Sequence, residues 1–330
     1  MGVKAQADLK TKAQDFIVEE VLGFELSGAG EHLWCWVEKI NANTLYVARQ
    51  WAQLVGCQRR DISHSGLKDR HAITRQWLCL PAIYGDKLPD VGEGWRIIQR
   101  VRHQKKLRVG THRFNDFVIR LREVAGDKTE IETALQSQVL EGFVNKFGAQ
   151  RFGRENLARA QQWVKSGKLP KKREERSLVL STLRAWLFNQ QLEMRESLGV
   201  VRSLLVGDRA MLRGSQSYFY IEKIDEDLQR RLNEGDIVPA GWLVGKEENT
   251  DEATPSADIR AKALEDYAAE VAYLQRYAQS DWRAMVVQAQ QLSWQWEEDK
   301  TLVLSFRLPK GCFATTLLEQ VFTIRDRSVE

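Results

Sequence analysis

The densest group of chemically capable side chains in this 330-residue sequence surrounds Asp69. Lys68 and Arg70 flank this aspartate, Gly66 precedes it, and a stretch with strand character begins soon afterwards at Trp77. Opposite charges beside a carboxylate favour its ionised form, and an ionised aspartate can act as a nucleophile or as a general base. A loop aspartate in a surface ion pair has the same local sequence, so this stretch alone leaves both interpretations open.

Residues 110–119 form a second stretch that combines basic, amide and aromatic side chains. Strand geometry would place Asn115, Phe117, Ile119 and Leu121 on one face. The amide could then hydrogen-bond a base edge or orient a carboxylate, while the phenylalanine ring could stack on a flipped base. Core packing of Phe117 beside a turn-forming asparagine is the alternative.

Motifs for metals and cofactors do not occur in the sequence. The five histidines and four cysteines include no C-x-x-C pair and no H-E-x-x-H motif. There is no G-x-x-x-x-G-K-[ST] loop, no G-x-G-x-x-G after a strand and no G-x-S-x-G elbow. We therefore expect no metal, no nucleotide cofactor and no serine-hydrolase triad.

Charge is distributed unevenly along the chain. Residues 96–122 hold nine Lys/Arg against one acid, whereas residues 247–270 hold eight acids against two cations. The basic stretch suits a phosphate-rich partner, although two differently charged solvated faces explain the pattern equally well. The cysteine usage, the lack of a signal sequence and the lack of a membrane-length apolar run favour a cytoplasmic protein.

The order of predicted elements indicates an α+β protein with an insertion. A helix is expected from Asn43 or Thr44 to Gly56, and another over residues 128–141. The first would carry Val47, Trp51, Leu54 and Val55 on one face. Further strands are expected at 16–38, 77–80, 117–122 and 302–307, and further helices at 177–198 and 256–292. Strands, then helices, then strands again suggest one domain interrupted by a helical insertion.

Several sequence blocks, in a consistent order across almost the whole chain, resemble the TruD family of tRNA pseudouridine synthases. The most specific are G-x-K-D-x-x-A-x-T at residues 66–74 and N-x-F-G-x-Q-R-F-G at residues 145–153. The others lie at residues 9–10, 15–20, 30–33, 115–117, 183–189 and 308–315. The chain departs from the family pattern at residues 12–15, where the usual proline before Asp15-Phe16 is missing, and at Cys312.

The resemblance implies a fold and a division of the chain. We expect a pseudouridine synthase-like catalytic domain with a mixed, largely antiparallel sheet flanked by helices. Residues 1–141 and 288–330 would form it, and residues 142–287 would form a mostly helical α/β insertion domain, with a tRNA-holding cleft between the two.

The resemblance also implies an activity and its residues. The expected reaction is cofactor-free isomerisation of a tRNA uridine, at position 13 of the D-arm, by a monomer without membrane association. Asp69 matches the catalytic aspartate. Substrate-binding roles fall to Phe16, Asn115, Phe117, Phe313, Lys10 and Lys68. RNA-backbone contacts fall to Lys105, Lys106, Arg108, Arg151 and Arg154. A non-catalytic tRNA-binding or RNA-folding protein on the same scaffold is the alternative, but it would not need Asp69 in an intact block.

Overall fold

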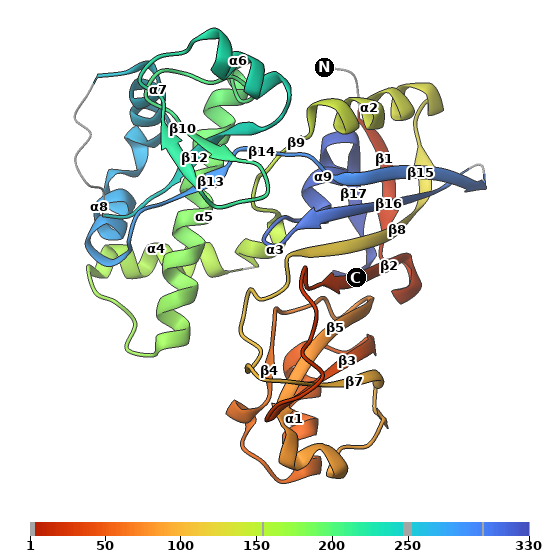
Figure 1. Cartoon of the computed structure of the whole chain (residues 1–330). Coiled ribbons are helices and arrows are strands. Elements are labelled where there is room, and N and C mark those ends of the chain that lie inside the picture. Colours follow the sequence, from red (N-terminus) through yellow and green to blue (C-terminus); the bar gives the residue numbers. More distant parts are fainter. Residues whose placement is uncertain (1–3, 154, 247–252, 299, 330) are drawn as a thin grey trace. The chain divides into compact units, whose positions relative to one another are not determined.

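The computed structural model describes residues 4–153, 155–246, 253–298 and 300–329 (Figure 1). Contacts divide the chain into two compact units. The first comprises residues 1–140, 289–314 and 321–330, and the second comprises residues 141–288 and 315–320. Both the amino-terminal and the carboxy-terminal segments therefore belong to the first unit.

A large mixed sheet forms the first unit. In its described part, eleven strands join in the order β15-β16-β8-β2-β5-β3-β7-β6, with β1 beside β8 and β17, and β4 beside β5. Most pairings are antiparallel, but β2–β5 and β1–β17 are parallel. These strands are β1 (Ala5–Leu9), β2 (Phe16–Val21), β3 (His32–Ile40), β4 (Ser63–His64), β5 (Ile73–Pro81), β6 (Val91–Gly92), β7 (Trp95–His103), β8 (Phe114–Ala125), β15 (Gln290–Glu298), β16 (Thr301–Pro309) and β17 (Phe322–Asp326). The expected mixed α+β fold with a large sheet is confirmed.

Helix α1 (Thr44–Val55) begins and ends where the sequence predicts. The Asn43 side chain accepts a hydrogen bond from the Tyr46 backbone N–H at 2.8 Å, and Gly56 ends the helix at a φ of 71°. Val47, Trp51 and Val55 are buried in one core with residues of β3 and β5. The prediction for Leu54 is wrong, because its side chain is 52% exposed.

Strand β8 carries the alternation that the sequence predicts. Asn115, Phe117, Ile119 and Leu121 are all buried, and the residues between them are more exposed. The strand pairs along one edge with β2 and along the other with β16. Helix α2 (Lys128–Glu141) follows it, as predicted, with Ile131 and Leu135 buried.

The second unit combines helices with a four-stranded sheet in the order β11-β10-β12-β13. Its core gathers Leu183 and Leu187 of α5, Trp242 of β12 and Tyr273 of α8. Its elements are β9 (Phe143–Val144), α3 (Ala149–Phe152), α4 (Asn156–Ser166), α5 (Arg173–Ser197), β10 (Arg209–Leu212), β11 (Tyr218–Tyr220), α6 (Glu226–Asn233), β12 (Ile237–Leu243), α7 (Pro255–Leu264), α8 (Ala268–Tyr277), β13 (Asp281–Ala284) and β14 (Val286–Val287). Helix α9 (Ala314–Val321) contributes residues 315–320 to this unit.

The helix predicted at 177–198 is confirmed as α5, but the one predicted at 256–292 is wrong in its second half. Helix α8 ends at Tyr277, and β13 follows. The reason is tertiary: residues 281–284 pair with β12, so that Trp282 lies opposite Trp242. A stretch of four residues is too short for its periodicity to distinguish a helix from a strand, so the pairing with β12 determines its structure.

Among the described residues, no helix is both long enough and apolar enough to cross a membrane.

Replacing Trp51 by alanine tests the core beneath α1. Because its side chain is fully buried, we expect Trp51→Ala to lower the free energy of unfolding of this unit by roughly 3–5 kcal/mol. The matched control Leu54→Ala, on the exposed side of the same helix, should change it by no more than about 0.5 kcal/mol. Urea unfolding followed by circular dichroism measures both, and equal losses would contradict the burial of Trp51.

Candidate active site

The loop that carries Asp69 is fixed by hydrogen bonds to buried side chains. The Gly66 carbonyl oxygen accepts a bond from the Gln76 amide at 2.9 Å. The Lys68 backbone N–H donates to the Thr44 hydroxyl at 3.1 Å, and that hydroxyl donates to Gln76 Oε1 at 2.8 Å. Thr44 and Gln76 are both buried, so the backbone on the amino-terminal side of Asp69 is attached to α1 and β5.

Asp69 forms an ion pair with Lys10, which lies 59 residues earlier in the chain. The Lys10 ammonium is 3.3 Å from Asp69 Oδ2 and 3.7 Å from Asp326 Oδ2. The side chain of Lys10 is 7% exposed and that of Asp69 is 18% exposed. Lys10 has a φ of 59°, a left-handed conformation that is uncommon for a residue with a side chain and often occurs at functional sites. A carboxylate with its countercharge is thus held at an accessible position.

The sequence predicts that Lys68 and Arg70 compensate the charge of Asp69, and the structure corrects this. Arg70 is exposed, while the Lys68 ammonium lies 2.9 Å from Glu20 Oε1. A cation from another part of the chain, Lys10, lies at hydrogen-bond distance from Asp69. Neighbours in sequence need not share a face, because alternate residues of an extended loop point in different directions.

A buried polar cluster lies around Lys68. Its ammonium donates to Asn115 Oδ1 at 2.8 Å, and Asn115 Nδ2 is 3.4 Å from His112 Nε2. The other ring nitrogen of His112 bonds to the Ser65 hydroxyl. Burial raises the pKa of the Glu20 carboxyl, an effect that the Lys68 charge partly offsets. Burial and the Lys68 charge lower the pKa of His112 to about 4, so its ring is neutral at pH 7.

Lys39 of β3 adds a further buried amine to this region. Its ammonium donates to the Thr74 hydroxyl at 2.7 Å and to the Ala42 carbonyl at 3.3 Å. Burial and the charge of Lys68 lower the pKa of Lys39 to about 7, against the opposing influence of Glu20 and Asp69. The positive charge of Lys68 therefore lowers the pKa values of Lys39 and His112 and opposes the rise in the pKa of Glu20.

Aromatic rings lie beside this polar cluster. The Lys10 ammonium is 4.6 Å from the centroid of the Phe16 ring, and Phe16 contacts Phe117 edge to face at 6.2 Å. Phe117 in turn stacks on Phe306 at 5.3 Å. All three rings are buried, so one face of Phe117 is already covered by protein. Phe313 is half-buried and lies in the turn between β16 and α9.

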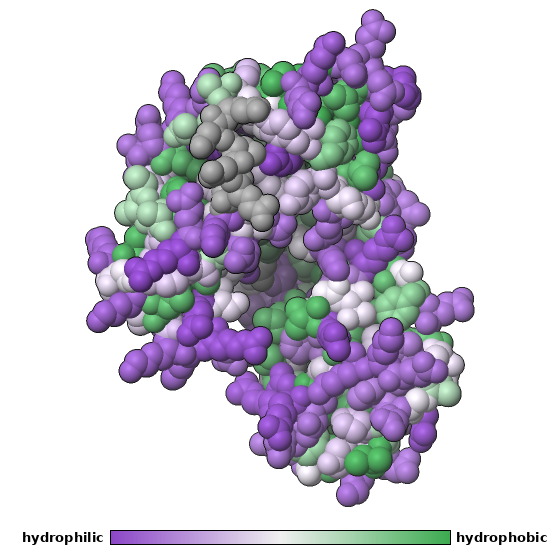
Figure 2. Space-filling view, turned by 60° about the vertical axis from the view of Figure 1, so that its left-hand side comes forward, coloured by the Kyte–Doolittle hydropathy of each residue, from purple (hydrophilic) through white to green (hydrophobic). Residues whose placement is uncertain are grey.

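The predicted RNA-backbone residues of the first unit follow β7. Lys105, Lys106 and Arg108 are exposed, and the loop that carries them is joined to the Asp69 loop by a 2.6 Å hydrogen bond from the Gly110 N–H to the Ser65 carbonyl. On the face displayed in Figure 2, hydrophilic residues predominate, and the apolar ones occur in small groups. Such a surface suits a polar, charged partner better than an apolar one.

Ion pairs reduce the positive field that the composition of residues 96–122 predicts. Four of the nine cations in this stretch are paired with carboxylates. The pairs are Arg96–Glu38 at 2.7 Å, Arg100–Asp90 at 2.7 Å, Arg120–Glu297 at 2.7 Å and Arg122–Asp15 at 2.8 Å. The loop at residues 105–108 is accordingly a better candidate for phosphate contacts than the strands on either side.

Arg151 of the second unit is half-buried in α3. Its guanidinium lies 6.0 Å from the centroid of the Phe147 ring, and burial lowers its pKa. Arg154, the other predicted RNA contact of this unit, lies outside the described residues.

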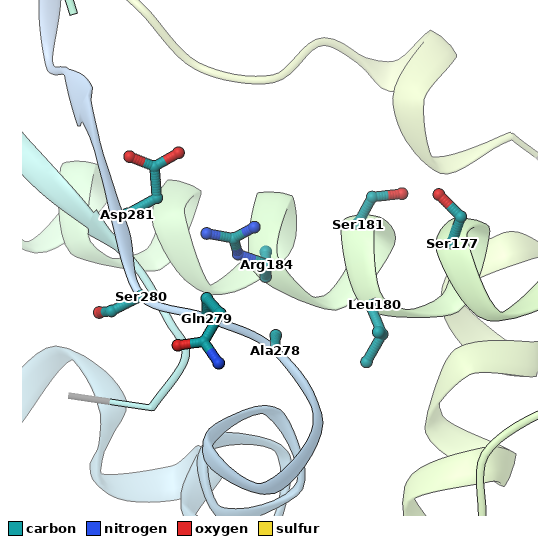
Figure 3. A pocket seen from close by; sticks show the side chains of 8 residues that line it. All are labelled: Ser177, Leu180, Ser181, Arg184, Ala278, Gln279, Ser280 and Asp281. Atoms are coloured by element: carbon teal, nitrogen blue, oxygen red, sulfur yellow. The ribbon is translucent and has the colours of Figure 1, made fainter.

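The second unit also contains an open pocket of about 360 Å³. Figure 3 shows Ser177 and Ser181 projecting from the same side of α5, with Arg184 farther along the helix and Asp281 beyond it. The lining is completed by Leu180, Ala278, Gln279 and Ser280. None of the predicted site residues that the structure describes lines it, and Arg184 already donates to the Leu243 carbonyl at 3.2 Å.

Comparison with known proteins decides the family. The family model described as tRNA pseudouridine synthase D (TruD) matches residues 3–159 and 156–321. This chain belongs to the TruD family. The tRNA pseudouridine synthase D of Hydrogenovibrio crunogenus is 35% identical over 326 residues, which cover 97% of this chain and 93% of that protein. The Proteus mirabilis protein of the same name is 36% identical over 334 residues, covering 99% and 95%.

The fold agrees with this assignment. A crystal structure of a Methanosarcina mazei protein described as TruD superposes with a TM-score of 0.71 at 18% identity. The match covers 97% of this chain and 94% of that one. The fold of this chain is therefore TruD-like.

Six side chains predicted from the sequence lie in contact with one another or next to each other in the first unit. They are Lys10, Phe16, Lys68, Asp69, Asn115 and Phe117. Sequence reasoning missed Glu20, Ser65, His112 and Asp326 as contributors to the site. Glu20 and Asn115 are opposite each other on β2 and β8, a pairing with no local signature. His112 offered a signal, because it lies three residues before Asn115 in the stretch already singled out.

The low pKa of His112 predicts a loss of stability in mild acid. The unfolded chain takes up this proton below about pH 6.5, whereas the folded chain does so only near the lowered pKa of about 4. The unfolded state binds more protons between these values, so the free energy of unfolding falls as pH decreases through this window. We expect the titration of His112 to lower the free energy of unfolding by about 2 kcal/mol between about pH 7.5 and about pH 5.

Urea unfolding of the natural protein and of His112→Gln at both pH values measures this contribution as the difference between their pH dependences. Other titrating groups are common to both proteins and cancel. An imidazole that titrates near its ordinary value in an NMR titration of the folded protein would contradict the prediction.

Proposed function

We propose that this chain isomerises a uridine of tRNA to pseudouridine, at position 13 in the D-arm, with Asp69 as the catalytic carboxylate. The observation that carries the proposal is the ion pair of Asp69 with Lys10 beside the Phe16 ring, within a chain of the TruD family. Relatives that bear the name tRNA pseudouridine synthase D match almost the whole chain, which supports tRNA as the substrate.

The reaction moves one bond and leaves the composition of the nucleotide unchanged. The C1′–N1 bond breaks with its electron pair going to N1, the base turns, and the C5=C6 electrons of the base form the C1′–C5 bond. The C5 proton is then lost and N1 is protonated. Asp69 can start this sequence by attacking C1′ or by removing a ribose proton to give a glycal. The isomerisation is redox-neutral, and the proposal includes no cofactor.

Each predicted substrate residue has a role that its surroundings support. Lys10 compensates the charge of Asp69 while its side chain lies over Phe16. Asn115 offers an amide beside Lys68, and Phe16, Phe117 and Phe313 provide aromatic surface that keeps a detached base in a dry environment. Extracting the uridine from its stack costs a few kcal/mol, which phosphate and stacking contacts offset.

We propose that Lys105, Lys106 and Arg108 contact tRNA phosphates, because they are exposed on a loop attached to the Asp69 loop. Residues 142–287 would form the family's insertion domain and add contacts through Arg151 and Arg154. The catalytic domain would then consist of residues 1–141 and 288–330.

Asp69→Asn tests the catalytic role. The amide retains the size of the carboxylate but cannot act as nucleophile or base, so we expect no detectable pseudouridine and tRNA binding within about threefold of the natural protein. Mapping pseudouridine along tRNA after incubation with each protein measures both the activity and the modified position.

Asp116→Asn is the matched control, because this acid on the same sheet pairs with Arg307 and alternates with the buried residues of β8. It should retain activity. Turnover by Asp69→Asn would remove this residue from the chemistry, and modification elsewhere in the tRNA would refute position 13.

The salt dependence of tRNA binding tests the phosphate contacts. Each phosphate neutralised by a cation releases condensed counterions, so log K falls with log salt by roughly 0.7–0.9 per contact. We expect the triple variant Lys105→Ala/Lys106→Ala/Arg108→Ala to bind more weakly and to lower the magnitude of this slope by about 2. Arg230→Ala is the control, because this exposed arginine of α6 is paired with Asp227 and Glu234. An unchanged slope in the triple variant would refute the assignment.

A further inference from the structure

The contacts of the Asn115 side chain allow its amide group only one of its two possible orientations. Asn115 is buried at the beginning of β8, and the Lys68 ammonium lies 2.8 Å from its Oδ1. An ammonium has only hydrogens to offer, so it can contact the amide oxygen but not the NH₂ group. Turning the amide over would bring NH₂ against NH₃⁺, and the flip is therefore excluded.

His112 fixes the opposite side of the same amide. Its Nε2 faces Asn115 Nδ2 at 3.4 Å, and because Nδ2 is a donor, Nε2 must be the nitrogen without a proton. The ring proton then resides on Nδ1, where the Ser65 hydroxyl oxygen accepts it, with Glu20 Oε1 at 3.8 Å. The His112 backbone N–H also donates to that hydroxyl, at 3.0 Å. Hydrogen bonding thus determines the tautomer as well as the amide orientation.

Glu20 keeps Lys68 in place. Its carboxylate is fully buried, lies 2.9 Å from the Lys68 ammonium and accepts a hydrogen bond from the Trp77 backbone N–H at 3.1 Å. A buried ammonium without this partner would lose its proton or move toward water. Either response would release Asn115 Oδ1 and allow the amide to turn.

We propose that Glu20, Lys68 and His112 are positioning residues that lock Asn115 as an N–H donor, and that this donor recognises a carbonyl oxygen of uracil and excludes cytosine. The inference rests on the proposed function and concerns its specificity. An amide nitrogen carries two hydrogens. One is directed at His112, and the second is left to donate to a base in the site.

A locked donor suits the isomerisation because of the symmetry of uracil. A half-turn of the free base about the line from N3 to C6 exchanges N1 with C5, and it also exchanges O2 with O4. A fixed N–H donor therefore faces a carbonyl oxygen both before the C1′–N1 bond breaks and after the C1′–C5 bond forms. Before the C1′–N1 bond breaks, the proposal places this donor at O4 of the uridine, where cytosine carries an amino group whose hydrogens would oppose those of Asn115. An amide free to flip would accept either group and lose the distinction.

Base selectivity tests the lock without requiring turnover. In an Asp69→Asn background, tRNA transcripts that carry either uridine or cytidine at the modified position are compared by equilibrium binding. With the lock intact, we expect the uridine transcript to bind about tenfold more tightly. Lys68→Met, which removes the cation from Asn115 Oδ1, should bring the ratio close to one. A ratio that Lys68→Met leaves unchanged would overturn the proposal.

Activity in the natural Asp69 background provides the second measurement. Asn115→Asp keeps the shape and can still pair with Lys68 but has no N–H, so kcat/KM should fall by about 100-fold. Glu20→Gln should also lower kcat, and adding Lys68→Gln should recover at least about tenfold, because the uncompensated charge disappears while a donor to Oδ1 remains. Failure of the double variant to recover would refute the role of the ion pair.

Glu19→Gln is the matched control, because this neighbouring acid on β2 pairs with Arg75 instead and should retain natural activity and selectivity. The natural protein is assayed first. Absence of pseudouridine there refutes the proposed function. If the natural protein is active but its preference for uridine does not depend on Lys68, the lock is refuted and the proposed function stands.

Discussion

The buried ion pair of Lys68 with Glu20 joins the loop that carries Asp69 to the centre of the large sheet. Lys68 belongs to the loop, and Glu20 belongs to β2, whose other neighbours are β5 and β8. Removing either partner would leave a buried charge without compensation, which costs several kcal/mol. The loop therefore has little freedom to move as long as the sheet is intact. Because Asp69 directly follows Lys68 in the chain, its backbone is held in place as well. Hydrogen bonds of Gly66 and Lys68 to Gln76 and Thr44 add to it.

The charges around the Asp69 loop are balanced only if each lysine forms an ion pair with a particular acid. Lys10 is placed against Asp69 and Asp326, whereas Lys68 is placed against Glu20. If Lys68 paired with Asp69 instead, Glu20 would be buried without a cation and would take up a proton. The observed arrangement leaves Asp69 with a countercharge on a side chain from another part of the chain, at the solvent-accessible side of the cluster. The acid that is most buried is structural, and the acid that is accessible is the one available for chemistry.

Local sequence predicts the parts of this structure that depend on local physics. The capping asparagine and terminal glycine of α1, the alternation along β8 and the length of α5 all follow from patterns within a few turns of chain. Asp69 was recognisable because its block is contiguous. The partner of Asp69 was not, since Lys10 is 59 residues away and its approach depends on how β1 is placed in the sheet. Likewise, nothing within residues 281–284 indicates that β12 offers them an edge, which is why a strand was mistaken for helix.

Strand register converts these separate elements into one site. Glu20 lies opposite Asn115, and Val18 lies opposite Phe117, in the pairing of β2 with β8. Because side chains alternate between the two faces of a sheet, slipping this pairing by one residue would change which faces of the two strands coincide. Glu20 would then be separated from Lys68, and Phe16 from the ring of Phe117. The aromatic contacts among Phe16, Phe117 and Phe306 resist that slip, as they bury large rings that fit only in this register. The rings of the first unit thus have a structural role in setting the position of the polar groups, whatever surface they also offer to a base.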